Sequence, residues 1–362
     1  MIKILFASII IIHGLIHLMG FVKAFQLVEI NQLTQNISKS IGLLWLISAL
    51  LLIIVAIILL LDYDWWWIIA VPTILLSQVL IVMYWQDAKY GTIANIILIV
   101  GIIIGYGNWN FNTMVKNELK SFVIPSIFER KIMTKEMINS LPPIIQKWLE
   151  QSNVIGKDII NQVHLKQIGK MRTTLEGKWM DVRAEQWFKT EKPGFIWVAD
   201  VKAPLGISLL GRDKYINGEG HMLIKLLSLI TVVDSKGKEI DQGTMLRYLG
   251  ETIWFPTAVL NKYIQWEQVD PTTVKAVMNY SGITASGIFK FNIKGDIVSF
   301  EAKRYYERKG KSTLENWFIQ IDPNSYKEFE GIRIPTKATV IWKLKEGDFA
   351  WYKLEITDIN YN

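Results

Sequence analysis

The chain has 362 residues, of which 51% are hydrophobic and 20% charged, with a formal net charge of +7 and no cysteine. The lack of cysteine excludes disulfides, thiolate zinc sites, iron–sulfur clusters and a cysteine nucleophile. Residues 1–111 carry eight charged side chains that sum to zero, so the rest of the chain carries the whole +7. We therefore expect two unlike parts, an apolar segment and a domain of ordinary composition.

Residues 1–111 are predicted to form four membrane-spanning helices, over 4–22, 41–61, 66–84 and 92–106. Each approaches the roughly 20 apolar residues that cross a bilayer, and Trp and Tyr gather at the predicted ends. Between the first two spans, residues 24–40 are expected to form either a short interfacial helix or a solvated loop.

Four spans put both ends of this segment on one side of the membrane. The positive-inside rule does not decide which side, because the lysines near the span ends balance. Three lie on each side: Lys23, Lys39 and Lys89 against Lys3, Lys116 and Lys120.

Residues 112–152 are predicted to form a helical linker, with a helix that is capped by Ser140 and has prolines in its first turn. Residues 153–362 alternate apolar and polar side chains, as in 337–344, in about eleven strands separated by turn signals. We expect an α+β domain, built on one long and strongly curved antiparallel sheet, a half-barrel with packed helices. A helical insertion near 241–256 begins at Asp241 as its cap and stops at Pro256.

Several strings of this domain resemble an uncharacterised bacterial membrane-protein family, catalogued as a domain of unknown function. They include Leu141-Pro-Pro…Trp148-Leu, Ala184-Glu-Gln-Trp-Phe, Pro193-Gly-Phe-Ile-Trp and Asp241-Gln-Gly…Leu246-Arg-Tyr-Leu, and the resemblance covers roughly residues 135–360. It implies no activity. The domain also resembles the curved-sheet fold of bacterial lipoprotein carriers, which implies a lipid ligand and a C-terminal domain outside the cytoplasm, anchored in the bacterial cytoplasmic membrane.

Charged residues interleaved with aromatic residues form the main candidate ligand-binding site. They either ring the mouth of a cavity, where they orient a ligand's polar head, or form an ion-pair network that pins the inserted helix to the sheet. The candidates are Glu185, Trp187, Trp197, Arg212, Asp213, Tyr215, Asp241, Arg247, Tyr248, Glu251 and Trp254.

His13 and His17 lie four residues apart and so share one face of the first predicted helix. They are weak candidates for a metal, because the spans offer no third histidine and no acidic residue in an apolar interior; packed neutral imidazoles are the alternative. The sequence has no P-loop, no H-E-x-x-H and no G-x-S-x-G motif. We therefore predict no catalytic residue, cofactor or metal.

These features favour an integral membrane protein that binds or handles a lipid or another hydrophobic ligand at the membrane surface, with the lipid bilayer as its partner. One alternative is an enzyme of unknown reaction that uses Glu185, Arg212, Asp213, Arg247 and Glu251. Another is an envelope scaffold or sensory module that binds through a sheet edge. No cluster of basic residues lies on a predicted helix or strand that could contact bases, so no nucleic acid is expected as a partner.

Overall fold

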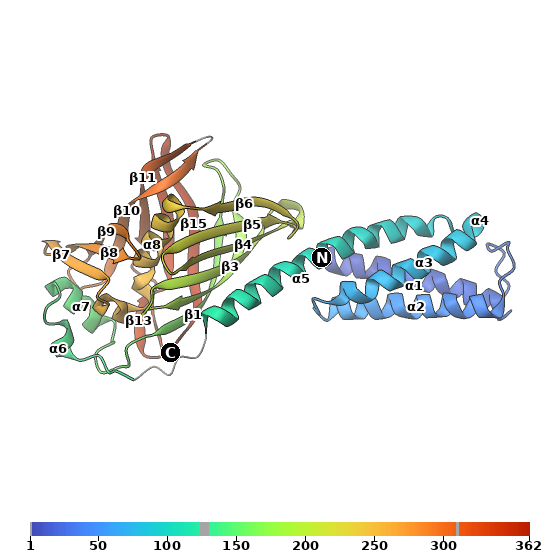
Figure 1. Cartoon of the computed structure of the whole chain (residues 1–362), viewed down its shortest axis with the longest axis horizontal. Coiled ribbons are helices and arrows are strands. Elements are labelled where there is room, and N and C mark those ends of the chain that lie inside the picture. Colours follow the sequence, from blue (N-terminus) through green and yellow to red (C-terminus); the bar gives the residue numbers. More distant parts are fainter. Residues whose placement is uncertain (1, 124–129, 309–310) are drawn as a thin grey trace. The chain divides into compact units, whose positions relative to one another are not determined.

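The computed structural model describes residues 2–123, 130–308 and 311–362, and the chain divides into two compact units. We call Met1–Asn117 together with Leu227–Leu229 the helical unit. The remainder, Glu118–Leu226 together with Ile230–Asn362, is the β unit. Figure 1 shows the elements of both.

The helical unit holds helices that are long and apolar enough to cross a membrane, which agrees with the four predicted spans. These are α1 (Ile2–Ala24), α2 (Lys39–Leu60), α3 (Trp66–Met83) and α5 (Gly91–Phe122), with the single turn α4 (Trp85–Ala88) before α5. The helix that contains the fourth span does not end near residue 106, because α5 continues to Phe122 without a break. Phe111 and Val115, four residues apart and both buried, extend the apolar spacing beyond the membrane-length segment.

Close packing of α1 on α2 depends on a small residue. A Cβ atom on Gly20 would lie 2.5 Å from the ring of Trp45, so only glycine lets this indole rest on the α1 backbone. Residues 25–38, which join the two helices, contain no helical turn of their own. The loop is therefore the correct alternative for this segment, and the interfacial helix is wrong.

The β unit contains a 13-stranded sheet and a two-stranded sheet, and every pairing is antiparallel. In chain order the strands are β1 (Gln162–Met171), β2 (Met180–Lys189), β3 (Gly194–Lys202), β4 (Ser208–Ile216), β5 (Glu219–Leu226), β6 (Ile230–Lys236), β7 (Ile264–Asp270), β8 (Thr273–Tyr280), β9 (Ile283–Phe291), β10 (Ile297–Arg308), β11 (Lys311–Ile321), β12 (Tyr326–Phe329), β13 (Ile332–Pro335), β14 (Lys337–Leu344) and β15 (Gly347–Tyr361). Strands β12 and β13 form the small sheet.

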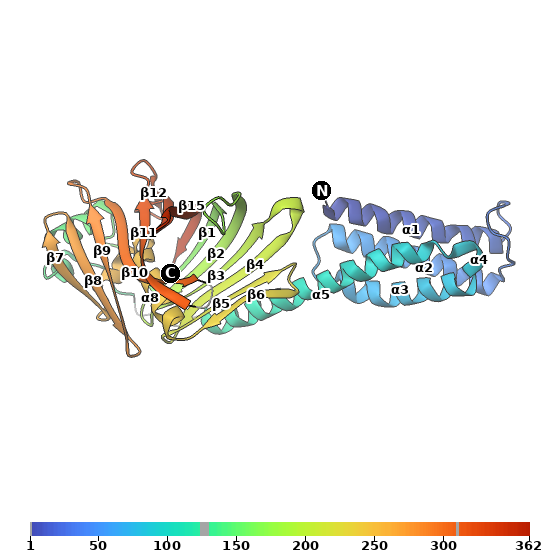
Figure 2. The ribbon, with the colours of Figure 1, turned by 90° about the horizontal axis from the view of Figure 1, so that it is seen from above.

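The large sheet curls around one helix. Its order is β6-β5-β4-β3-β2-β1-β15-β14-β11-β10-β9-β8-β7, and helix α8 (Lys238–Glu251) contacts β4 and β5 near one end and β9 and β10 near the other. A single helix reaches both groups only if the sheet bends back on itself, as Figure 2 shows. The fold is thus the predicted half-barrel, with α8 inside its curve.

Other helices complete this unit, and two predicted caps are wrong. Helix α7 (Pro143–Gln151) follows the short α6 (Lys135–Ile138) and begins after Pro142, not at a Ser140 cap. Helix α8 begins after Gly237, so Asp241 lies within the helix instead of capping it. Two 3₁₀ turns, Thr252–Trp254 and Pro256–Leu260, complete the insertion. Residues 124–129 of the expected linker lie outside the described residues.

Candidate functional site

The centre of the predicted charged group is a buried ion pair on the concave side of the sheet. Arg247 of α8 donates from Nη1 to Asp213 Oδ2 and from Nε to Glu251 Oε1, both at 2.8 Å. The exposed fractions of these side chains are 14% for Arg247, 2% for Asp213 and 7% for Glu251. The guanidinium also lies 4.9 Å from the ring centre of Trp197, which shields it further from water.

Two glutamines complete this network, and the sequence interpretation did not include them. Gln186 Nε2 donates to Glu251 Oε2 at 2.7 Å, and Gln167 Nε2 donates to Gln186 Oε1 at 3.3 Å. Trp197 Nε1 in turn donates to Gln167 Oε1 at 3.2 Å. Burial raises the pKa of Glu251, while the Arg247 guanidinium and Gln186 oppose that rise. The sequence did contain a signal for Gln186: it is a polar residue at a position of β2 where the alternation places a buried side chain, between Ala184 and Phe188.

Arg212 belongs to a second cluster. Its Nε lies 3.0 Å from Glu118 Oε2, and its Nη2 lies 3.0 Å from His221 Nδ1. Because a guanidinium only donates, His221 Nδ1 is the acceptor, and the proton of the imidazole is on Nε2, which donates to Asp234 at 2.8 Å. Burial lowers the pKa of His221, and the positive charge of Arg212 lowers it further.

Four other predicted residues have structural contacts. Tyr248 Oη bonds to Tyr263 Oη at 2.9 Å, and Trp254 Nε1 donates to the Pro335 carbonyl at 3.2 Å. Asp241 accepts the backbone N–H of Gly220 at 2.7 Å, which ties α8 to β5. Tyr215 is buried, and burial raises the pKa of its hydroxyl.

Glu185 and Trp187 lie on the outer face of β2, and cross-strand pairing through Val198 puts Arg212 on the same face of the sheet. Glu185 Oε2 lies 2.8 Å from His164 Nε2, and the His164 ring stacks on Trp187 with 4.6 Å between ring centres. The predicted group is therefore split between the two faces of the sheet. On the inner face, Arg247 pairs with Asp213 and Glu251, and all three side chains are largely buried, which favours the ion-pair network over a ligand-orienting ring.

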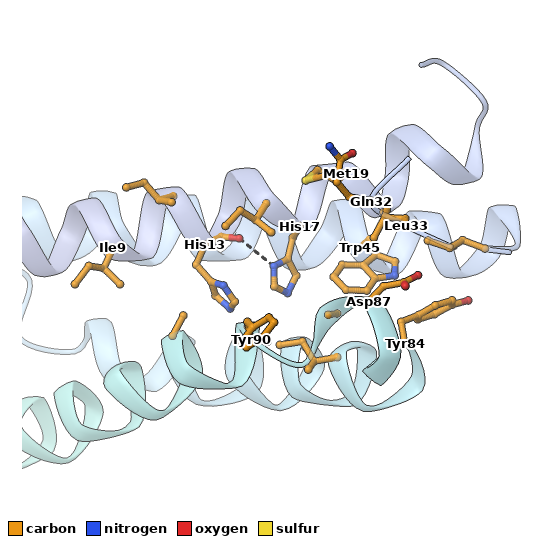
Figure 3. Close-up of a pocket in the computed structure, with 18 residues that line it drawn as sticks. Ile9, His13, His17, Met19, Gln32, Leu33, Trp45, Tyr84, Asp87 and Tyr90 are labelled. Atoms are coloured by element: carbon orange, nitrogen blue, oxygen red, sulfur yellow. Dashed lines mark hydrogen bonds between the residues drawn. The ribbon is translucent and has the colours of Figure 1, made fainter. Parts of the chain in front are cut away.

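A cavity of about 360 Å³ lies in the helical unit, beside the two histidines of α1 (Figure 3). It has the size of small-molecule sites, which start near roughly 300 Å³. Its walls come from α1, α2, α3, α4 and α5 and from the 25–38 loop. The lining residues are Ile9, Ile12, His13, Ile16, His17, Met19, Gly20, Gln32, Leu33, Ile37, Trp45, Ile81, Tyr84, Asp87, Ala88, Tyr90, Gly91 and Ala94.

His13 is held by polar side chains of α3 and α5. Its Nε2 lies 3.0 Å from Asn95 Oδ1 and 3.3 Å from Ser77 Oγ. Asn95 Nδ2 donates to Gln78 Oε1 at 2.9 Å, so the amide is fixed with its oxygen toward the histidine. These partners were visible in the sequence only as isolated polar residues inside apolar runs.

His17 has one ring nitrogen bonded and one without a partner. Its Nδ1 lies 3.0 Å from the backbone carbonyl oxygen of His13, the bond drawn in Figure 3. Its Nε2 is buried and has no hydrogen-bond partner among the described residues, and the same holds for Nε1 of Trp45, whose ring centre lies 4.9 Å from that of His17. A buried polar atom left unpaired is unfavourable, so such atoms mark places where a ligand or water binds.

The loop over one end of the cavity is fixed by Asp87. This carboxylate accepts the backbone N–H groups of Thr34 at 2.7 Å and Gln35 at 3.0 Å. The Gln35 backbone and the Thr34 side chain hold the pKa of Asp87 below its ordinary value, so it stays ionised. Within the described ranges, no group of three or more His, Cys, Asp or Glu is placed to hold a metal ion.

Comparison with known proteins gives a family but no activity. The profile of a family of unknown function, DUF6544, matches residues 131–354. No curated protein matches the chain. Among solved structures, a Vibrio parahaemolyticus domain named for outer-membrane lipoprotein sorting matches with 10% identity and a TM-score of 0.29, covering 56% of this chain and 86% of that chain.

Proposed function

Because this chain belongs to DUF6544, a family of unknown function, its activity has to be inferred from its own structure, and we propose that it binds a hydrophobic ligand between its apolar helices. The observation that carries the proposal is the cavity of about 360 Å³, whose wall is mostly apolar but holds the unpartnered Nε2 of His17. An apolar pocket with a few placed polar groups is typical of sites for amphiphilic small molecules.

The position of the pocket fits a ligand that comes from the bilayer. Ile12 and Ile16 of α1 line it, and both are more than half exposed on the apolar outside of the helices. The opposite polar end is formed by Gln32, in the loop between α1 and α2, and Asp87, in the short helix α4. A lipid-like molecule would place its chain along α1 and its head toward the membrane surface.

The test is a binding measurement on the full chain in detergent, with 11-bromo-1-undecanol as the probe, because bromine quenches the fluorescence of a tryptophan that it touches. The chain has 15 tryptophans, so the signal of Trp45 is taken as the difference between the wild type and Trp45→Phe. We expect saturable quenching of Trp45. Ala94→Phe, which fills the pocket, should abolish it, and Ile96→Phe, an exposed site on the same helix, should not.

Quenching that rises without saturation, or that is equal in the wild type and Ala94→Phe, would refute the proposal. Either result would mean that the probe reaches tryptophan through the detergent and not through the pocket. Unchanged circular dichroism of both variants checks that each one folds.

We also propose that the helices lie in a bacterial cytoplasmic membrane with the β unit outside the cytoplasm. The connection between α2 and α3 carries Asp62 and Asp64 but no Lys or Arg, as is usual for external loops. The chain has no cysteine, so a single one can be placed at Asp64 or Lys89 and labelled in intact cells. A membrane-impermeant maleimide should label position 64 and spare position 89, and the reverse pattern would overturn the orientation.

A further inference from the structure

Resting on the ligand pocket proposed above, we infer that its ligand is a lipid alcohol, whose hydroxyl donates a hydrogen bond to Nε2 of His17. The inference begins with the bond between His17 Nδ1 and the His13 carbonyl oxygen, at 3.0 Å. A carbonyl oxygen can only accept, so Nδ1 must carry the proton.

That bond decides what the other nitrogen can do. A neutral imidazole has one N–H, so Nε2 of His17, a residue that lines the cavity, keeps a lone pair and is an acceptor. The neutral form is the one that fits this site, because a buried charge needs a partner and no described carboxylate pairs with His17. Asp87, the carboxylate among the lining residues, is already engaged by Thr34 and Gln35.

The unpaired acceptor Nε2 of His17 limits which chemical groups of a ligand can bind beside it. Ester, ether and ketone oxygens cannot donate and would leave Nε2 unpaired. An ammonium group donates, but it would bring a positive charge into an apolar site where Asp87 is occupied. A hydroxyl is neutral, donates one hydrogen bond and still accepts others, so it satisfies Nε2 without burying a charge.

His13 does not compete for this hydroxyl through its Nε2, which donates to Asn95. Trp45 offers a second unpaired position. Its Nε1 lies on the side of the indole away from His17 in the view of Figure 3, and as a donor it needs an oxygen acceptor. A head with two oxygens, such as a glycerol monoester, supplies a hydroxyl for His17 and an acceptor for Trp45.

The test compares two probes that differ only in the donor. The first is 11-bromo-1-undecanol and the second is its methyl ether, each titrated against the full chain with Trp45 quenching as the signal. We expect the alcohol to bind about tenfold more tightly than the ether, the factor that one buried hydrogen bond supports. In His17→Phe the two affinities should become equal, whereas Ile96→Phe, at an exposed position of α5 outside the pocket lining, should keep the preference.

Each outcome bears on a different statement. If the wild type binds both probes equally and Ala94→Phe binds neither, the inference of a lipid alcohol is refuted and water fills the position at Nε2. The proposal that the cavity binds a ligand is then kept. Absence of saturable quenching by either probe would refute the pocket. The comparison of the two probes needs only the wild type and its Trp45→Phe reference, so it decides the inference even if His17→Phe fails to fold.

Discussion

Replacement of Arg247 by methionine removes the guanidinium that Asp213 and Glu251 share in the core of the β unit. Methionine fills much of the volume, but it leaves two carboxylates, each bonded to Arg247 at 2.8 Å in the wild type, without their hydrogen-bonded counter-charge. Breaking a buried pair in this way costs about 3–5 kcal/mol. For a domain of this size, each kcal/mol lowers the melting temperature by roughly 2–4 °C, so we expect a decrease of roughly 6–20 °C.

The same variant should depend on pH in a defined direction. Burial already raises the pKa of Glu251, and loss of Arg247 removes the main group that opposes the rise. The folded state then binds a proton at pH values where the unfolded state has released it, so stability falls as pH increases through that window. The deficit of Arg247→Met should therefore be smaller at pH 5 than at pH 8.

The assay is thermal unfolding of the full chain in detergent, followed by near-ultraviolet circular dichroism. Glu185→Gln is the matched control, because it breaks the half-exposed pair with His164 and should change stability by less than about 1 kcal/mol. A melting temperature for Arg247→Met within 3 °C of the wild type at pH 8, or equal losses in both variants, would contradict the assignment of Arg247 as the structural centre of the network.

Three further changes test other contacts. Gly220→Ala should cost about 1–3 kcal/mol, because its Cβ would lie 2.4 Å from Thr244 Oγ1, whereas Gly211→Ala, with its nearest contact at 3.5 Å, should be tolerated; equal melting temperatures would contradict this. Because the pKa of His221 is lowered in the folded state, the wild type should lose stability as pH falls below about 6.5. In His221→Gln the melting temperature, measured between about pH 5 and 8, should fall less over that range. Asp87→Ala should speed amide hydrogen exchange at Thr34 and Gln35, since it removes their acceptor; unchanged exchange would mean that the loop is held by other contacts.

The regular parts of the fold follow from the sequence, and the exceptions have identifiable causes. About eleven strands were expected, and the described residues form fifteen. Of those missed, β6 is mostly exposed on both faces, so its side chains do not alternate, and β12 and β13 have only four residues each. Strand β5 has an irregular burial pattern beneath α8, which also escapes a period-two search.

The candidate sites were less predictable, because their residues depend on which face of a strand each side chain occupies and on contacts between segments far apart in the sequence. Glu185 and Gln186 are adjacent, yet Glu185 faces outward while Gln186 joins the Arg247 network. A list of charged residues selects the first and passes over the second. The pocket beside His17 needs five helices and a loop to meet, and no local pattern records that Trp45 or Asp87 would line it.

The position of β15 has a consequence for biosynthesis. Strand β15 pairs with β1 at the middle of the sheet, joining Val163 to Tyr361, whereas β6 and β7 at the two edges are neighbours in the chain. The halves before and after α8 can each form local hairpins as they emerge from the ribosome, but the seam between them closes only when the final strand has been synthesised. Until then β1 and β14 present unpaired edges, so a stalled or truncated chain would be prone to aggregation at the centre of the sheet and not at its borders.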